Sequence, residues 1–250
     1  MRSRIQSPTS ILTYKECPRK YYYRYILGLR TKPSIYLIRG RIAHEVIRKI
    51  FESLKKDQGI IDEGQLILRV KAVFLDEWRN ARSDLLKVGK TRIQLDLSKK
   101  ETESMLINWA RNLAKNACEN QTMIIPQTEL QLISEEYGVQ GFLDAVFEEH
   151  GTIKILDFKT GKPSDISEEY HLQLAIYALL YGECNGNAPH SVGIHFLQNG
   201  TIHWLPVDEK LLSLARRECK LIHLNTMSQN IDDYPCLCGG RCREDFYEAR

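Results

Sequence analysis

An aspartate and a lysine lie two positions apart in an otherwise apolar segment, "KILDFKTGK" at residues 154–162. Ile155 and Phe158 are residue types that a buried strand favours. Because side chains alternate along a strand, Asp157 and Lys159 share one face. A buried charge needs an opposite charge or a metal ion to be tolerated. Taken alone, the segment fits either an ion pair at the end of a strand or part of a reactive site.

A second carboxylate lies on the preceding predicted strand, where Asp144 occupies the centre of "GFLDAVF". A hairpin turn at Gly151 would bring Asp144 beside Asp157 and Lys159. Two neighbouring carboxylates repel each other unless a divalent cation neutralises them, and oxygen ligands select Mg²⁺, Mn²⁺ or Ca²⁺. A lysine at such a site can orient or deprotonate a water molecule and stabilise the charge of the transition state. These groups suit the hydrolysis of a phosphodiester.

Two predicted helices carry further candidates. His44 lies in "RGRIAHEVI", and "HLQLAIYALL" places Gln173 and Tyr177 four positions apart, on one helix face. A lone helical histidine is usually structural, and a glutamine–tyrosine pair usually serves packing. Beside a carboxylate metal site, however, His44 becomes a candidate nitrogen ligand that shifts the preference toward Mn²⁺. The Gln173–Tyr177 pair could then hold a phosphate or order the substrate.

Four of the seven cysteines are candidates for a shared site. Cys17 stands in "ECPRKYYYRY", and Cys236, Cys238 and Cys242 crowd into "PCLCGGRC". In an intracellular chain such thiols indicate metal or cluster chemistry rather than a disulfide framework. Thiolates are the ligands of iron–sulfur clusters, four cysteines also form closed zinc sites, and unligated thiols are a third alternative.

The charge distribution is uneven although the net charge is only +3. The first 50 residues hold twelve Lys and Arg against two acids, whereas the remaining 200 hold 23 bases and 30 acids. A basic region on a mildly acidic body indicates an anionic partner, most often nucleic acid, with a solvated helix surface as the alternative. No apolar run approaches the ~20 residues of a membrane helix, and the N-terminus lacks the apolar centre of a signal peptide. We therefore expect a cytoplasmic protein without a membrane partner.

Hydrophobic periodicity predicts the elements that must position these side chains. Helical spacing is expected in the first third, with a polar connection near 88–100, and short β-rich runs between glycine turns follow as an antiparallel meander. The dipeptide Asn199-Gly200 predicts a later hairpin. The expected fold class is α/β, a central sheet flanked by helices. Predicted helices cover 7–29, 36–56, 64–87, 101–120, 167–183 and 208–226; predicted strands cover 128–138, 139–151, 152–161 and the hairpin 191–207.

Four motifs in this order resemble the RecB-type nuclease domain of the PD-(D/E)XK superfamily: "GRIAHEVI", "GFLDAVF", "ILDFKTGK" and "QLAIY". The resemblance runs over residues 5–245. The segment 7–29 is also similar to the beginning of AddB-type nucleases and of RecB-like exonucleases associated with CRISPR loci. The resemblance implies a restriction-endonuclease-like core with a mixed sheet, an N-terminal helical region and a Cys-rich C-terminal tail. It also implies a metal-dependent DNA nuclease, expected to be an exonuclease on single-stranded ends in DNA repair, recombination or CRISPR adaptation.

The resemblance also implies roles for individual residues. Lys159 would be the catalytic lysine, and Gln173 with Tyr177 would form the DNA-binding Q-x-x-x-Y motif. The Mg²⁺ or Mn²⁺ ligands would be His44, Asp144, Asp157 and the main-chain carbonyl of Phe158.

The four cysteines would by the same resemblance hold a [4Fe–4S] cluster that joins the two ends of the chain. This set comprises Cys17, Cys236, Cys238 and Cys242. Closing a loop of over 200 residues would restrain the unfolded chain. The relatives usually space the last three as C-x2-C-x5-C, whereas "CLCGGRC" is C-x-C-x3-C. This departure leaves zinc as the alternative.

A run of tyrosines and basic residues, "RKYYYRYILGLR", provides a candidate DNA surface. Aromatic rings stack on bases while guanidinium and ammonium groups neutralise phosphates. Arg19, Lys20, Tyr22 and Arg24 are therefore predicted DNA contacts. Alternatively, the tyrosines pack around the cysteine site with their hydroxyls reaching water.

The expected organisation is a single nuclease domain over 1–250. Two other functions stay open: a non-catalytic DNA-binding scaffold subunit of a helicase–nuclease complex, and a site-specific endonuclease of the same superfamily. The sequence has no G-x-x-x-x-G-K-[ST] signature, so unwinding would come from a separate helicase. Within the domain we expect a basic cysteine-containing segment at 1–35, a helical part at 36–122, the catalytic sheet at 123–207, and a C-terminal helix with the cysteine tail at 208–250.

Overall fold

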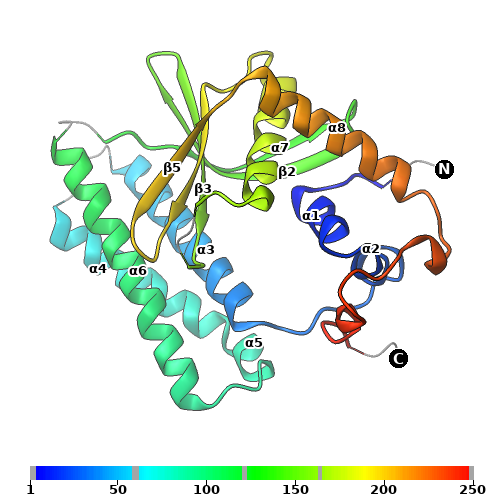
Figure 1. Cartoon of the computed structure of the whole chain (residues 1–250). Helices are drawn as coiled ribbons and strands as arrows, with labels where there is room; N and C mark the ends of the chain where they lie inside the picture. Colours follow the sequence, from blue (N-terminus) through cyan, green and yellow to red (C-terminus); the bar gives the residue numbers. More distant parts are fainter. Residues whose placement is uncertain (1–3, 58–61, 120–122, 163–164, 248–250) are drawn as a thin grey trace.

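A mixed five-stranded sheet forms the centre of the protein (Figure 1). The computed structural model describes residues 4–57, 62–119, 123–162 and 165–247. The first three strands form the predicted antiparallel meander, the third and fourth are parallel, and the last two form the predicted hairpin. In spatial order the strands are β1 (Gln127–Ser134), β2 (Val139–Glu149), β3 (Thr152–Lys159), β4 (Ser191–Phe196) and β5 (Thr201–Pro206).

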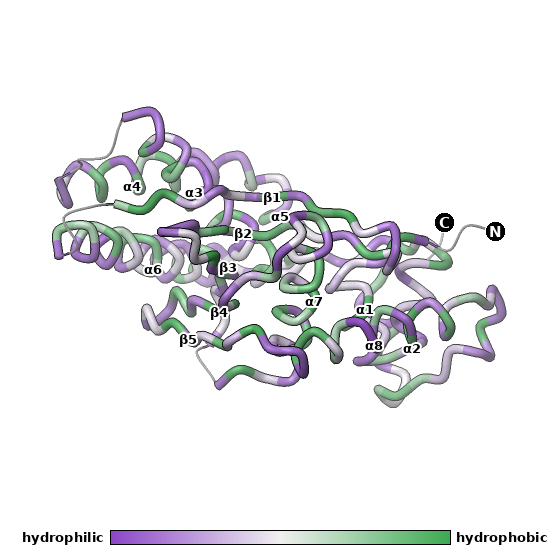
Figure 2. Tube along the Cα trace, turned by 90° about the horizontal axis from the view of Figure 1, so that it is seen from above, coloured by the Kyte–Doolittle hydropathy of each residue, from purple (hydrophilic) through white to green (hydrophobic). Residues whose placement is uncertain are grey.

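Helices cover both faces of this sheet, which confirms the predicted fold class. In Figure 2, α3, α4 and α6 lie on one side of the strands, and α7 with α1 and α8 lies on the other. Each side has its own apolar core. The helices are α1 (Pro8–Glu16), α2 (Pro18–Tyr21), the π-helix η1 (Tyr22–Ile26), α3 (Ile35–Lys56), α4 (Glu63–Asn80), α5 (Arg82–Lys87), α6 (Arg92–Glu119), α7 (Glu168–Asn185) and α8 (Glu209–Asn225), followed by the 3₁₀ turns η2 (Ile231–Asp233) and η3 (Arg241–Arg243). None of the helices in the described ranges is both long and apolar enough to span a bilayer.

The turn between β2 and β3 sets the register of the two strands. His150 and Gly151 have φ angles of 48° and 77°, and two successive left-handed residues are what a tight hairpin turn requires. This confirms the predicted turn at Gly151. The ladder then pairs Ala145 with Leu156, so Asp144 stands opposite Asp157 when the register is extended by one residue.

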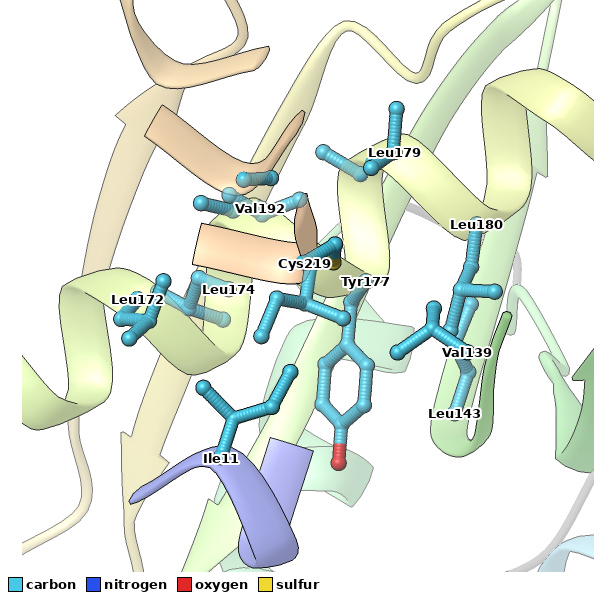
Figure 3. Packing of buried hydrophobic residues seen from close by; sticks show 14 of the residues in the cluster. Ile11, Val139, Leu143, Leu172, Leu174, Tyr177, Leu179, Leu180, Val192 and Cys219 are labelled. Atoms are coloured by element: carbon cyan, nitrogen blue, oxygen red, sulfur yellow. The ribbon is translucent and has the colours of Figure 1, made fainter. Parts of the chain in front are cut away.

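Helix α7 packs closely on the sheet because β2 has a glycine at the contact. A Cβ atom at Gly141 would lie 3.0 Å from Leu180 and 3.3 Å from the Tyr177 ring. The helix is apolar on most of its surface, and in Figure 3 the Tyr177 ring lies between Ile11 and Leu143 within the core. The glycine in "GFLD" thus fixes the distance between α7 and the strand that carries Asp144.

The N-terminal part departs from the prediction at three places. The helix predicted over 64–87 is interrupted at Ala81, between α4 and α5. Helix α6 begins at Arg92, inside the stretch expected to be a polar connection. Thr91 and Gln94 exchange hydrogen bonds between side chain and main chain, a T-x-x-Q capping box that starts the helix there. The helix predicted over 7–29 breaks at Cys17, which is extended (φ −163°, ψ 112°) because the residue before Pro18 is disfavoured in the helical region.

Candidate active site

His44 of α3 and Asp144 of β2 meet around the backbone of Phe158. Asp144 Oδ2 accepts a hydrogen bond from the Phe158 N–H at 2.8 Å, and its Oδ1 lies 3.1 Å from His44 Nδ1. His44 Nε2 lies 2.8 Å from the Phe158 carbonyl oxygen. Burial alone would lower the pKa of His44, but the charge and hydrogen bond of Asp144 outweigh it and raise this pKa to about 9. Two predicted ligands, His44 and Asp144, therefore contact the residue of β3 whose carbonyl is the third.

Asp157 and Lys159 form an ion pair on the opposite face of β3 from the Phe158 ring. Lys159 Nζ lies 2.7 Å from Asp157 Oδ2, and the Asp157 side chain is only 2% exposed. Burial raises the pKa of Asp157, and the neighbouring Lys159 ammonium opposes that rise. The strand periodicity placed both side chains on one face, and the structure confirms this.

Gln173 connects the ion pair to α7. Its Oε1 accepts a hydrogen bond from Lys159 Nζ at 2.9 Å, while its Nε2 donates to Asp157 Oδ1 at 3.1 Å and to the Tyr177 hydroxyl at 2.8 Å. Tyr177 is 7% exposed. The predicted Q-x-x-x-Y pair thus holds Asp157 and Lys159 in place, and its contact with DNA remains a prediction.

This group of side chains fits a hard divalent cation. Asp157 Oδ2 is buried, and among the described residues its polar partner is the Lys159 ammonium at 2.7 Å. A carboxylate oxygen that accepts one hydrogen bond keeps a second lone pair for a ligand bond. The surrounding donors are carboxylate and carbonyl oxygens with one imidazole nitrogen, which suit Mg²⁺ or Mn²⁺.

Glu129 of β1 belongs to the same group and was not singled out from the sequence. Its carboxylate lies with a His44 nitrogen and an Asp144 oxygen in a set whose atoms are all within 4.8 Å of one another. Burial and the neighbouring Asp144 raise the pKa of Glu129. Counting outward from the turn between β1 and β2 would have placed Glu129 opposite Asp144. The segment "TELQL" alone gives no sign of this, because an acid on an edge strand is common.

The site opens into a cleft of about 1080 Å³ between α3 and the sheet. His44, Glu129 and Lys159 line it, together with Arg41 and Arg48 of α3. Both arginines are paired with acids of the cleft wall, Arg41 with Asp84 at 2.8 Å and Arg48 with Glu45 at 2.6 Å. The exposed pair of Arg41 is weak, so a phosphate can compete for its guanidinium group, whereas Glu45 holds Arg48 through two hydrogen bonds.

The C-terminal tail lies beside α2 (Figure 1), and the four candidate cysteines come together there. Their sulfur atoms all lie within 4.8 Å of one another, and Cys236 Sγ is 3.6 Å from Cys238 Sγ and 3.7 Å from Cys242 Sγ. The extended backbone before Pro18 turns Cys17 toward the tail, where the Leu237 N–H donates to its sulfur at 3.4 Å. Chain segments 220 residues apart are therefore joined here.

The tetrad of Cys17, Cys236, Cys238 and Cys242 fits a thiolate-bound metal centre. Hydrogen bonds from the Gly240 N–H and from Cys238 lower the pKa of Cys236 to about 6, which favours the thiolate. Four sulfurs on one tetrahedral zinc, with Zn–S bonds of about 2.3 Å, lie about 3.8 Å apart. A [4Fe–4S] cluster holds its thiolates at the outer corners of a cube and needs them farther apart. The observed sulfur spacing is closer to that of a single ion.

The tyrosine run fastens the tail to the N-terminal helices. Tyr22 is 8% exposed and its hydroxyl donates to the Gln229 carbonyl at 3.1 Å. Arg19 Nε donates to the Tyr234 carbonyl at 2.7 Å. Lys20 pairs with Glu16 and Asp245, and Arg24 lies over the Tyr25 ring. Packing around the cysteine site thus accounts for these contacts, and DNA binding by Arg19, Lys20, Tyr22 and Arg24 stays a prediction.

Comparisons with known proteins bear on this geometry. A family model described as "PD-(D/E)XK nuclease superfamily" matches residues 6–242. A search of curated proteins found no match. Among solved structures, the chain is similar to one titled "Crystal structure of SSO0001", with 15% identity, coverage of 76% of this chain and 90% of that chain, and a TM-score of 0.29. Because the family model matches almost the whole sequence, the chain belongs to the PD-(D/E)XK nuclease superfamily, whose members are generally metal-dependent nucleases.

Proposed function

We propose that this nuclease is a DNA exonuclease that hydrolyses single-stranded ends with Mg²⁺ or Mn²⁺, in DNA repair, recombination or CRISPR adaptation. The observation that carries the proposal is two groups of contacts that meet at adjoining residues of β3 beside the cleft. One joins His44 and Asp144 to the Phe158 peptide, and the other joins Asp157 and Lys159 to Gln173. These contacts support the proposal, because they hold the residues expected to bind the metal and the expected catalytic lysine in place.

The chain's own residues have distinct tasks in this proposal. His44, Asp144, Asp157 and the Phe158 carbonyl would hold the cation, which supplies Lewis acidity to the scissile phosphate when it is bound. Lys159 donates hydrogen bonds to the attacking water and to the oxygens that gain charge in the transition state. Gln173 acts as a positioning residue, because its Oε1 accepts a hydrogen bond from the Lys159 ammonium at 2.9 Å.

The rim of the cleft supports a single-stranded substrate. Tyr36 and Leu37 begin α3 beside the site, and their exposed fractions of 74% and 69% leave them free to contact a ligand. Aromatic side chains stack on unpaired bases without sequence preference, and Arg41 in the same cleft can bind the phosphates of the strand. A stacking surface next to phosphate-binding groups suits a strand that passes through the cleft with its bases unpaired.

The two alternatives predict different behaviour. A non-catalytic scaffold subunit has no need of the complete set of Asp144, Asp157 and Lys159, so it is disfavoured. A site-specific endonuclease would cut closed circles at fixed positions.

The test is digestion of end-labelled linear single strands, linear duplexes and closed circular single strands with Mn²⁺ or Mg²⁺, with EDTA as the metal-free control. We expect a ladder from one end of the linear single strand and intact circles. Fixed fragments from circles would support the endonuclease, and absence of any product would support the scaffold.

We also propose that the cysteine tetrad holds a metal centre that fastens the chain ends together. The family resemblance supports a [4Fe–4S] cluster, and the sulfur spacing of 3.6 to 3.7 Å supports a single zinc ion. Metal and sulfide analysis of protein purified without oxygen separates the two. Four irons with brown colour identify the cluster, one colourless zinc identifies the single ion, and metal-free folded protein would contradict the proposal.

A further inference from the structure

We infer that Glu129 is a ligand of the hydrolytic cation, alongside His44 and Asp144. This inference rests on the proposed metal-dependent function. It adds a carboxylate from β1, a strand that holds none of the motif residues. It assigns β1 a direct part in the site, so that three adjacent strands, β1, β2 and β3, each contribute an acid.

Strand register brings the three acids into one row across the sheet. The ladder between β1 and β2 pairs Thr128 with Ala145 and Leu130 with Leu143, so it sets Glu129 opposite Asp144. The turn between β2 and β3 sets Asp144 opposite Asp157 in turn. Opposed residues of antiparallel strands lie about 4.5–5.5 Å apart at Cβ, which is close enough for two carboxylates to share one cation.

The backbone of β1 is strained at Glu129. Its φ of 51° lies in the left-handed region, although glutamate has a Cβ and the residue lies inside a strand. Such conformations are costly and persist at sites where the surroundings enforce them, often for a functional reason.

The Glu129 carboxylate has no competing partner. In the part of the chain that the structure describes, no hydrogen bond or ion pair engages it, and the side chain is half-buried in the wall of the cleft. The Asp144 carboxylate beside it repels its charge, and this repulsion outweighs the attraction of either His44 or Arg48. A half-buried acid beside a second acid and an imidazole is stabilised when a divalent cation binds among them.

The test measures Mn²⁺ binding directly, by isothermal titration and by electron paramagnetic resonance, on the full chain with its cysteine centre intact. Glu129→Gln keeps the size of the side chain and removes its charge. Glu45→Gln is the matched control, because Glu45 lines the same cleft but its carboxylate is held by Arg48 at 2.6 and 2.9 Å. Circular dichroism confirms that each variant is folded.

We expect the Kd for Mn²⁺ to rise at least 10-fold in Glu129→Gln, with a changed resonance spectrum, and to stay within 2-fold in Glu45→Gln. An unchanged Kd and spectrum in folded Glu129→Gln, while Asp144→Asn abolishes binding, would overturn the role of Glu129 and leave the proposed nuclease intact. If the wild-type protein binds no Mn²⁺, the proposed function fails as well, so the two failures are distinguishable.

Discussion

The acidic site at the sheet and the cysteine tetrad both gather metal-binding side chains, yet they are assembled in opposite ways. The acidic site takes its groups from three adjacent strands and α3, so hairpin register places them. The tetrad takes its sulfurs from the two ends of the chain. A metal bound by oxygen and imidazole ligands beside a cleft can also bind a substrate, as catalysis requires. A metal bound by four thiolates has no coordination position left and serves as a structural centre.

This difference predicts which property each region controls. Removing a group from the acidic site should reduce cleavage and leave the fold in place, because register and packing do not depend on the metal. Removing a sulfur from the tetrad should lower the free energy of unfolding and leave the chemistry of the remaining folded molecules unchanged. The following predictions test this separation, beginning with the largest effect.

Cys17→Ser should cause the largest loss of stability. Opening a closed loop of some 220 residues lowers the free energy of unfolding by about 5 kcal/mol by the chain-entropy estimate. Urea unfolding followed by circular dichroism measures this loss. Cys184→Ser, an exposed cysteine outside the tetrad, is the matched control and should change stability little. Equal unfolding midpoints for Cys17→Ser and wild type would mean that the tetrad is not a staple.

Asp144→Asn should lower the cleavage rate by about 10³-fold, since an amide oxygen binds a divalent cation far more weakly than a carboxylate. The metal content of the tetrad should stay at the wild-type value. Initial rates on a labelled single strand, together with metal analysis, check both statements. Loss of the tetrad metal in this variant would show that the two centres are coupled and would contradict their separation.

Two histidines near Phe158 have opposite pKa shifts. Asp144 raises the pKa of His44, whereas His195 has an apolar environment. His195 of β4 is 5% exposed, and burial lowers its pKa to about 4. Since the unfolded value is near 6.5, the unfolded chain binds the proton first as the pH falls. Stability is therefore full above pH 6.5 and falls by about 3 kcal/mol as the pH drops to 4.

Urea unfolding at pH 7.5, 6, 5 and 4 for wild type and His195→Phe measures this effect. Subtracting the two curves removes the contribution of all other groups. The wild type should lose about 3 kcal/mol more than the variant across the window. Parallel curves for the two proteins would mean that His195 does not titrate on unfolding.

Gln173→Leu should lower kcat by about 10-fold to 100-fold while KM changes little, because the side chain orients Lys159 and Asp157. Tyr177→Phe removes only the hydroxyl that accepts from Gln173 Nε2, so its effect should be several-fold at most. Steady-state kinetics on a short single strand separates kcat from KM. A large rise in KM in Gln173→Leu would instead indicate a direct contact with DNA.

Glu129→Gly should produce the smallest change, and in the opposite direction. Glycine removes the Cβ that makes a φ of 51° costly, so the free energy of unfolding should rise by about 1 kcal/mol without added metal. Glu129→Ala keeps the strain and provides the comparison. Thermal unfolding in EDTA measures the difference, and equal midpoints for the two variants would show that the backbone is not strained there.

The sequence predicted those features that depend on local pattern. Alternation in "KILDFKTGK" predicted that Asp157 and Lys159 share a face. Helical spacing predicted the buried side of α3, the helix that carries His44. Glu129 was missed because its role arises from pairing with Asp144 on another strand, which no residue within "TELQL" indicates.

For the N-terminal helices the composition left two alternatives open, DNA contact and packing around the cysteine site. A tyrosine-rich basic run is the composition of a DNA surface, but composition does not reveal that Tyr234 and the tail pack against it. Helix α6 was predicted to start too late because the Thr91–Gln94 capping box lies within a polar stretch and was not recognised.

The most direct test of the account is the rate at which Lys159→Ala degrades an end-labelled single strand with Mn²⁺, beside wild type and Lys162→Ala. Lys162 is exposed and three positions downstream, so it controls for the loss of one positive charge. We predict a loss of about 10²-fold to 10³-fold for Lys159→Ala, with a folded protein and an unchanged tetrad, and wild-type cleavage by Lys162→Ala. Equal cleavage by all three proteins would contradict a catalytic site at Asp157 and Lys159.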